Sequence, residues 1–321
     1  MRTVEITFEQ LHEIASRVYN EVKDDNSGKN ADYIPYLDNI DSNLFGLAIV
    51  TKDARIINIG DTEYSFGVES VSKVFTAILA MRQKGPQKVL EDIGADATGL
   101  PFNSIMAILL ENSHPSTPLV NSGAISAVSM IEPAGNSTKK WEAITEIFSE
   151  LCGSEVKLID ELYKSETQTN FNNRSIAWLL KSYARIYDDP DMSLDLYTRQ
   201  CSLGITTTQL ATAAATIAFE GQNPVTGKTV FDKVISSKIT SLMATVGFYE
   251  HTGNWMFGCG VPAKTGVGGG IMGIVPGQFG IAAFSPRLDS SGNSVRAQKA
   301  IRKIANALEV NVFANNRIKI L

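Results

Sequence analysis

The sequence has few of the residues that build metal centres and disulfide frameworks. It contains only three histidines and three cysteines among 321 residues. No two histidines have the i, i+4 spacing that brings two ligands together on a helix face, and no cysteines form a C-x-x-C pair. We therefore expect no metal site and no disulfide. The odd number of widely spaced thiols favours a location in the reducing cytoplasm.

Long apolar runs and an excess of positive charge are missing as well. No apolar run reaches the roughly 18 residues that span a lipid bilayer, and residues 1–6 lack the apolar segment of a secretory signal peptide. Asp and Glu outnumber Lys and Arg by 34 to 29, which gives a net charge of −5. A nucleic-acid-binding protein would need a basic face. We therefore expect neither a membrane nor a nucleic acid as a partner.

Two common motifs are absent or stand in the wrong context. The sequence contains no G-x-S-x-G, so a Ser-His-Asp triad has no candidate serine. Residues 268–273 formally match G-x-G-x-x-G, but strand-like residues follow where a dinucleotide site requires a helix. We therefore expect no nucleotide and no other cofactor. An enzyme with this sequence would work without histidine.

Hydrophobic periodicity places strands at both ends of the chain and helices between them. Apolar residues recur at helical spacing over 7–23, 70–82, 125–131, 141–151, 175–187, 208–218, 231–245 and 293–308. Short β-type runs, each pair joined by turn-forming residues, occupy 44–50, 55–59, 271–275 and 280–284. We predict an α+β fold in which both chain ends build one antiparallel sheet flanked by helices.

This pattern also predicts how the chain is organised. We expect residues 1–321 to form a single domain with two parts. Residues 1–69 and 237–321 make the α/β part, and residues 70–236 make a mostly helical part.

One short motif combines a hydroxyl with an amine at the predicted start of a helix. Ser70 and Lys73 form an S-x-x-K sequence, and side chains three residues apart on a helix are neighbours. Free backbone N–H groups at a helix start favour an oxyanion and depress the pKa of a nearby amine. Burial would depress this pKa further and leave an amine that accepts the serine proton. The alternative is an N-capping Ser70 beside a solvated Lys73.

Two further motifs follow in the order found in a known class of serine enzymes. Asn121 begins an Asn-bearing turn, and Lys264-Thr265-Gly266 lies just before a predicted strand. This ordered set resembles the active-site motifs of β-lactamases and penicillin-binding proteins. The glycines after Thr265 suit an edge strand that approaches a substrate closely. A backbone N–H there, that of Val267, can pair with the Ser70 N–H as an oxyanion hole.

From residue 31 to residue 295 the sequence resembles the serine-dependent glutaminases. The segments that carry the resemblance are 31–35, 70–75, 102–104, 120–125, 165–166, 173–177, 197, 201–202 and 262–270. The resemblance implies a β-lactamase/transpeptidase-like fold and hydrolysis of L-glutamine to L-glutamate and ammonia through a glutamyl-enzyme on serine. It also implies a homodimer or homotetramer that needs no cofactor.

The resemblance assigns roles to single residues. Ser70 is the implied nucleophile, Lys73 lies beside it, and Tyr249 is the implied proton relay. Together with the backbone of Val267, these make the implied catalytic set. The implied glutamine contacts are Tyr33, Ser70, Asn121, Glu166, Asn173, Tyr197, Tyr249 and Val267. Glu69 departs from the family pattern, in which a glutamine usually precedes the nucleophile, and an extra carboxylate there changes the local potential.

The implied contacts suit a free amino acid, which carries both of its charges at one end. Glu166 can hold the α-ammonium by a charge-assisted hydrogen bond. Asn121, Asn173 and the tyrosine hydroxyls can donate to the α-carboxylate. If the stretch is helical, a spacing of seven residues puts Glu166 and Asn173 on one helix face. Such a pocket leaves the side-chain amide at Ser70.

Other functions are compatible with the same residues. A β-lactam-reactive enzyme, or another amidohydrolase of this fold, would share Ser70 and Lys73, although the β-lactam-reactive enzyme predicts export. A non-catalytic amino-acid-binding module predicts the loss of Ser70 or Lys73, and both are present. We therefore expect an enzyme, and a glutaminase before the alternatives.

Overall fold

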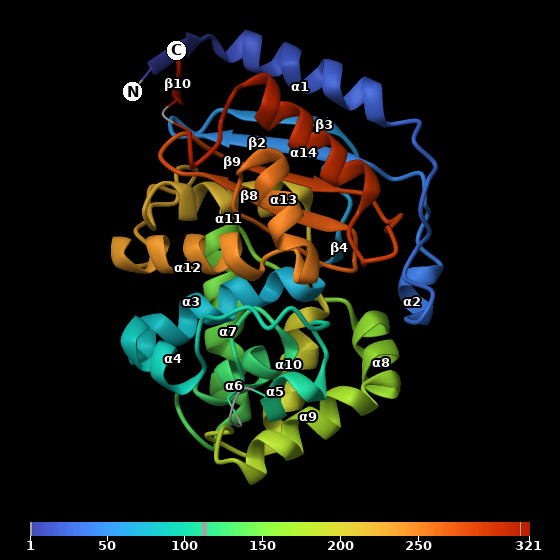
Figure 1. Ribbon diagram of the computed structural model, residues 1–321, viewed down its shortest axis with the longest axis vertical. Coiled ribbons are helices and arrows are strands. Elements are labelled where there is room, and N and C mark those ends of the chain that lie inside the picture. The colour runs from blue at the N-terminus through green and yellow to red at the C-terminus, as the bar shows by residue number, and fades with distance from the viewer. Residues whose placement is uncertain (1, 111–113, 315) are drawn as a thin grey trace.

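A five-stranded antiparallel sheet forms the centre of the upper half of the molecule (Figure 1). The computed structural model describes residues 2–110, 114–314 and 316–321. The strands of the sheet are β2 (Gly46–Thr51), β3 (Ile56–Gly60), β7 (Ala263–Thr265), β8 (Gly270–Val275) and β9 (Phe279–Phe284). They lie in the order β3-β2-β9-β8-β7, and β2 pairs directly with β9. The prediction that both chain ends build one antiparallel sheet is confirmed.

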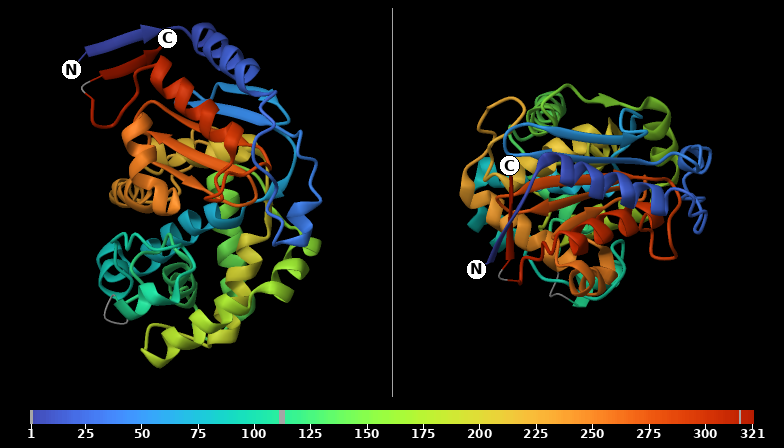
Figure 2. Two further views of the ribbon diagram at one scale, coloured as in Figure 1. Left: turned by 45° about the vertical axis from the view of Figure 1, so that its right-hand side comes forward. Right: turned by 90° about the horizontal axis from the view of Figure 1, so that it is seen from above.

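Helices cover both faces of this sheet (Figures 1 and 2). One face carries α1 (Phe8–Val22) and α14 (Val295–Ala307), with α13 (Thr252–Cys259) beside them, and the other carries α11 (Thr207–Ala218) with α12 (Lys233–Val246). The alternation of side chains along a strand explains this arrangement. Leu47 and Ile49 of β2 join the apolar cluster under α1 and α14, whereas Ala48 and Val50 join the cluster around α11.

The contact between α11 and the sheet is unusually close. A Cβ atom added at Gly280 in β9 would lie 2.1 Å from the backbone N of Ala215 in α11. Only glycine fits at such a position. The helix contributes mainly alanines to this face, and small residues on both surfaces allow the two backbones to approach.

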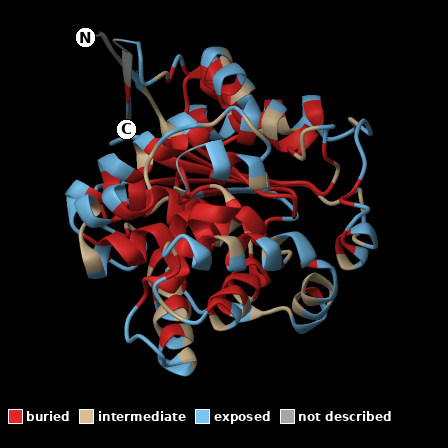
Figure 3. Ribbon diagram, turned by 60° about the horizontal axis from the view of Figure 1, so that its bottom comes forward, coloured by how far each residue is buried: buried red, intermediate tan, exposed pale blue. Residues whose placement is uncertain are grey.

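The lower half of Figure 1 consists of helices. Their bounds are α3 (Ser72–Lys84), α4 (Pro86–Asp92), α5 (Ile105–Leu110), α6 (Asn121–Ser129), α7 (Ser137–Cys152), α8 (Asp160–Thr169), α9 (Phe171–Ser182) and α10 (Pro190–Cys201). Every residue from Ser72 to Met81 of α3 is buried. Figure 3 shows that buried residues concentrate in the sheet and in the helices next to it. The start of α3 therefore lies at the junction between the sheet and the helices.

Some elements cross the predicted boundary between the two parts. α11 belongs to residues 70–236, yet it packs against β2, β8 and β9 of the sheet. A small second sheet joins β4 (Phe66–Gly67), β6 (Leu203–Ile205) and β5 (Lys157–Leu158). Periodicity could not predict these strands, because two or three residues are too few to show an alternation.

The two ends of the described chain also pair with each other. β1 (Arg2–Ile6) runs parallel to β10 (Asn316–Ile320) in a separate two-stranded sheet. A short helix, α2 (Pro35–Asp38), lies between α1 and β2 and packs against α8. The strands β1 and β10 and the helix α2 were not predicted from the sequence. The partner of each terminal strand lies about 300 residues away in sequence, which no local window can detect.

Candidate active site

Ser70 and Lys73 lie together at the entrance to α3. Ser70 is the middle residue of a single 3₁₀ turn, η1 (Glu69–Val71), that leads directly into the helix. The Nζ atom of Lys73 donates to the Oγ atom of Ser70 over 2.5 Å. The Lys73 side chain is only 1% exposed. The predicted pairing of hydroxyl and amine is present, and the alternative of a solvated Lys73 is wrong.

The surroundings of Lys73 favour a neutral amine. Burial lowers the pKa of Lys73, while the nearby Cys201, Glu69 and Glu166 oppose this shift. Within the described residues, no carboxylate oxygen lies within ion-pair distance of its Nζ atom. A neutral amine at hydrogen-bond distance from a hydroxyl can accept the hydroxyl proton.

The K-T-G motif lies opposite η1. Lys264 and Thr265 belong to β7, the edge strand of the sheet, so the motif begins inside a strand and does not merely precede one. A Cβ atom added at Gly266 would lie 3.3 Å from the Ser70 backbone N, and one at Gly268 would lie 2.2 Å from the Gly67 carbonyl oxygen. The glycines therefore let the strand end approach the protein's own backbone beside Ser70.

Two backbone N–H groups at this contact are free to bind an anion. Among the described residues, neither the Ser70 N–H nor the Val267 N–H donates to a protein oxygen. Val267 lines the same pocket as Ser70. This pair of donors is the arrangement expected for an oxyanion hole.

The Tyr249 side chain approaches Ser70 from a second 3₁₀ turn. Tyr249 begins η2 (Tyr249–His251) with a φ of 53°, which non-glycine residues rarely adopt. Its hydroxyl donates to the Thr265 carbonyl oxygen over 3.5 Å. Burial raises the pKa of Tyr249, and a side-chain hydrogen bond with Ser70 opposes that shift. The phenol therefore keeps its proton at neutral pH and stays within reach of Ser70.

Lys264 is a site residue to which the sequence analysis gave no role, although its motif was recognised. Its side chain is fully buried, and the Nζ atom donates to the Thr265 carbonyl oxygen over 2.7 Å. The same atom lies 4.5 Å from the centre of the Tyr249 ring. Burial lowers the pKa of Lys264 well below its usual range, and the nearby Lys73 amine adds to this shift. Lys264 thus hydrogen-bonds the end of β7 and also lies against the Tyr249 ring.

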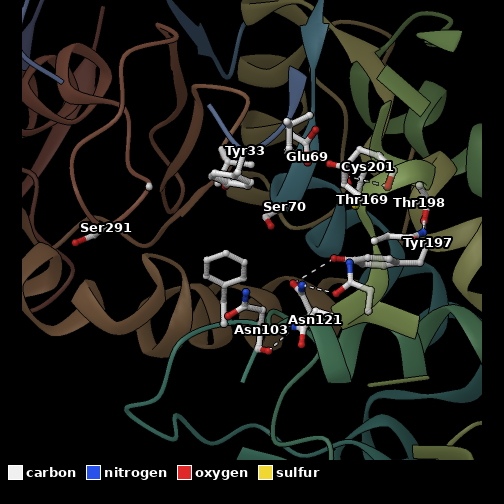
Figure 4. Close-up of a pocket in the computed structure, with 18 of the residues that line it drawn as sticks. Tyr33, Glu69, Ser70, Asn103, Asn121, Thr169, Tyr197, Thr198, Cys201 and Ser291 are labelled. Carbon is white, nitrogen blue, oxygen red and sulfur yellow. Dashed lines mark hydrogen bonds between the residues drawn. The ribbon is translucent and has the colours of Figure 1, made fainter. Parts of the chain in front are cut away.

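A pocket of about 510 Å³ opens in front of Ser70 (Figure 4). The predicted substrate contacts that line it are Tyr33, Ser70, Asn121, Glu166, Asn173, Tyr197 and Val267. Tyr249 lies behind Phe102, another lining residue, with ring centres 4.5 Å apart. Apart from Tyr249, the structure brings all the predicted contacts to the lining of one cavity.

The amides in this pocket form a connected group. Asn121 Nδ2 donates to Asn173 Oδ1 over 2.9 Å, and the Tyr197 hydroxyl donates to Asn121 Oδ1 over 3.2 Å (Figure 4). Tyr33 lies at the exposed rim. Asn103 also lines the pocket, and the sequence analysis gave it no role although its segment was part of the resemblance. The group offers fixed donors and acceptors to a small polar ligand.

Two local predictions about these residues are wrong. Asn121 does not sit in a turn but is the first residue of α6. Glu166 and Asn173 do not share one helix, because α8 ends at Thr169 and α9 begins at Phe171. At Asn170 the backbone leaves the helical region, and its side chain instead bonds Arg174 and Thr198. Both residues still reach the pocket, from two helices.

The pocket holds no constellation of metal ligands. Over the described ranges, no group of three or more His, Cys, Asp or Glu side chains is positioned to hold a metal ion. In the same part of the chain, no helix is both long enough and apolar enough to cross a lipid bilayer. The three cysteines are free and buried.

The antiparallel sheet, the helical part and the serine–lysine pair at their junction define a β-lactamase-like fold with the site of an amidohydrolase. A sequence model described as Glutaminase matches residues 28–313. The chain is 64% identical over 313 residues to a glutaminase of Bacteroides thetaiotaomicron, in an alignment that covers 98% of each chain.

Solved structures agree with this match. A structure described as the probable glutaminase ybaS superimposes with a TM-score of 0.95 at 46% identity, covering 97% of this chain and 100% of the other. A probable glutaminase from Bacillus subtilis, complexed with 6-diazo-5-oxo-L-norleucine, gives a TM-score of 0.84 at 28% identity, covering 95% and 96%. The chain belongs to the glutaminase family. It is an amidohydrolase whose reaction is the hydrolysis of L-glutamine to L-glutamate and ammonia.

Proposed function

We propose that Ser70 is the nucleophile of this reaction and Lys73 its general base. The observation that carries the proposal is the 2.5 Å hydrogen bond between Lys73 Nζ and Ser70 Oγ in a buried setting. In the first step Ser70 Oγ attacks the side-chain carbonyl carbon of glutamine, and its proton passes to the Lys73 amine. The N–H groups of Ser70 and Val267 stabilise the oxyanion.

The intermediate then breaks down in two stages. Tyr249 relays the proton from Lys73 to the amide nitrogen, the C–N bond breaks, and ammonia leaves a glutamyl ester on Ser70. Water attacks this ester and gives its proton to Lys73, which returns a proton to Ser70 as L-glutamate leaves. The neutral phenol of Tyr249, within hydrogen-bond reach of Ser70, suits such a relay.

We also propose that the polar side chains of the pocket bind the α-ammonium and the α-carboxylate of the substrate. Glu166 holds the α-ammonium, and the Asn121–Asn173–Tyr197 group with Tyr33 binds the α-carboxylate. The connected hydrogen bonds of this group support the proposal, because they fix the amides before the substrate arrives. A preorganised polar wall loses little entropy on binding.

The test of the nucleophile is Ser70→Ala. We expect ammonia release from L-glutamine to fall by at least about 10³-fold, because no other group forms the ester. Ser291→Ala is a matched control, since Ser291 lies at the outer rim of the same pocket, away from Ser70 (Figure 4). Undiminished turnover in Ser70→Ala would remove Ser70 from the mechanism.

Three broader proposals concern the whole protein. We propose that the α/β part and the helical part act as a single catalytic domain, since Val267 and Ser70 meet between them. We propose a cytoplasmic location, which three buried free thiols support. We propose a homodimer or homotetramer of the 34.8 kDa chain. Light scattering after size exclusion tests the assembly, and a monomeric mass would contradict it.

A further inference from the structure

Glu69 is a buried carboxyl group that the proposed mechanism does not use. It directly precedes Ser70, it is 4% exposed, and its φ of 48° is rarely adopted by non-glycine residues. Its Oε1 atom accepts from no donor among the described residues. Figure 4 shows Glu69 beside Ser70 in the pocket, which Glu69 also lines. A buried carboxylate without a donor is costly, so this group must find a proton or a cation.

The neighbour of Glu69 is a second carboxyl group, that of Glu166. Both side chains, one from η1 and one from α8, line the pocket in front of Ser70 and lie close enough to shift each other's pKa. Two carboxylates are acceptors only, so the contact is attractive only when one carries a proton. Burial, followed by the contact with Glu166, raises the pKa of Glu69 well above its usual range. Burial also raises the pKa of Glu166, and the hydrogen bond with Glu69 opposes that shift. One proton therefore lies between the two carboxyl groups.

Other titratable groups around the pair do not provide a permanent counter-charge. Lys73 of α3 is the nearest cation, but burial lowers its pKa and it bonds Ser70. The remaining groups that face Glu69 or Glu166 are Tyr33 before α2, Tyr197 and Cys201 of α10, and Tyr249 of η2. The hydroxyl and thiol groups are neutral near neutral pH. A cation from outside is the partner that the pair lacks.

We propose that Glu69 and Glu166 share one proton before substrate binds, and that the α-ammonium of L-glutamine displaces this proton into solvent. The inference rests on the proposed binding of the ammonium by Glu166 and extends it to a second carboxyl group. It makes Glu69 a residue that determines specificity for an amino acid over its des-amino analogue. One positive charge leaves and another enters, so the net charge beside the oxyanion hole stays the same.

The exchange predicts a measurable proton release. In the Ser70→Ala protein, which binds without turnover, we expect up to about one proton released per bound L-glutamine at pH values between the ordinary glutamate pKa and the raised pKa of the pair. The affinity should rise with pH by up to about tenfold per pH unit across the same window. Titration calorimetry in buffers with different ionisation enthalpies measures both quantities.

Two comparisons isolate the pair. Adding Glu69→Gln keeps a donor for Glu166 but removes the exchangeable proton, so proton release and the pH dependence of affinity should vanish. Adding Glu250→Gln, which alters another carboxylate in the pocket lining, should leave the release unchanged. The ligand 4-carbamoylbutanoate, which is glutamine without its α-amino group, should release no proton from either protein.

The outcomes separate this inference from the proposed function. Equal proton release with and without Glu69→Gln, or binding of L-glutamine to Ser70→Ala without any release, overturns the shared proton and leaves the glutaminase mechanism intact. Loss of L-glutamine binding in a folded Ser70→Ala/Glu69→Gln protein would show that Glu69 carries a permanent negative charge. This result would also overturn the shared proton. A protein that neither binds nor hydrolyses L-glutamine would overturn both proposals.

Discussion

Two buried lysines in different places of the molecule have opposite surroundings. Lys73 at the junction and Lys140 in the helical part are 1% and 0% exposed. The Lys140 ammonium forms an ion pair of 2.5 Å with Asp188 and donates to the Ser129 carbonyl oxygen over 3.0 Å. Among the described residues, the Lys73 amine hydrogen-bonds the Ser70 hydroxyl and lies 5.5 Å from the centre of the Tyr197 ring. The same residue type at the same depth is structural in one place and reactive in the other.

The partner carboxylate explains the difference. Burial alone raises the pKa of Asp188, but hydrogen bonds from Lys140 and from the backbone N–H groups of Gly135 and Asp189 lower it overall. Asp188 thus stays ionised. In the part of the chain that the structure describes, no carboxylate accepts from Lys73, so burial shifts that amine toward its neutral, basic form. A buried lysine becomes a reactive base only when no counter-ion lies beside its amine.

Lys73→Met should produce the largest effect, because it removes the lysine to which we assign the reactive role. We expect ammonia release to fall about 10³- to 10⁴-fold, because Ser70 loses its base. The thermal midpoint should not fall, because the substitution removes a buried amine that lacks a counter-ion. Steady-state kinetics and calorimetry check both. A large loss of stability with normal turnover would reverse the roles assigned to the two lysines.

Lys140→Met should lower the stability of the protein and leave its turnover unchanged. Asp188, whose side chain is 10% exposed, would be left without its cation, and breaking a buried pair in this way typically costs about 3–5 kcal/mol of folding free energy. Denaturant unfolding measures this loss, and turnover per folded molecule should stay near that of the unmodified protein. Lys139→Met is the control, because its ammonium is exposed on the same helix. A Lys140→Met protein as stable as the control would contradict a structural role.

Tyr249→Phe sharpens the comparison by removing the relay next to the reactive lysine. We expect kcat to fall about 10²-fold, at the lower end of proton-transfer contributions. The ring and its contacts with Phe102 and Lys264 remain, so stability should change little. If kcat is unchanged while KM rises, Tyr249 contacts substrate without moving a proton.

Glu69→Gln should give the smallest effect, which depends on pH. The folded-state pKa of Glu69 lies above its unfolded value, so between the two the folded protein binds more protons than the unfolded chain. Stability therefore falls as pH rises through this window, by at most about 1.4 kcal/mol per pH unit. The variant lacks this loss, so its thermal midpoint should exceed that of the unmodified protein increasingly from about pH 5 upward.

Calorimetric scans of this variant at several pH values provide the measurement. Glu250→Gln serves as the control, because Glu250 is an exposed carboxylate near the same pocket. Parallel pH curves for Glu69→Gln and the unmodified protein would show that Glu69 does not hold its proton in the folded state.

Elements with a clear hydrophobic period were predictable from sequence. The hairpin of β2 and β3, the hairpin of β8 and β9, and helices such as α1 and α14 lie within a few residues of their predicted bounds. The two-residue strands β4 and β5 and the bend at Asn170 between Glu166 and Asn173 were not predictable. Their conformation follows from partners distant in sequence, which local patterns do not contain.

The sequence by itself determined the order of the motifs, the alternation that builds the sheet and the closeness of Ser70 to Lys73, because each depends on neighbours within a few residues. Tertiary structure alone decided that Lys73 lacks a counter-ion while Lys140 has one, and that Glu69 meets Glu166. Charge state in a buried site is set by groups that only folding brings within a few ångströms.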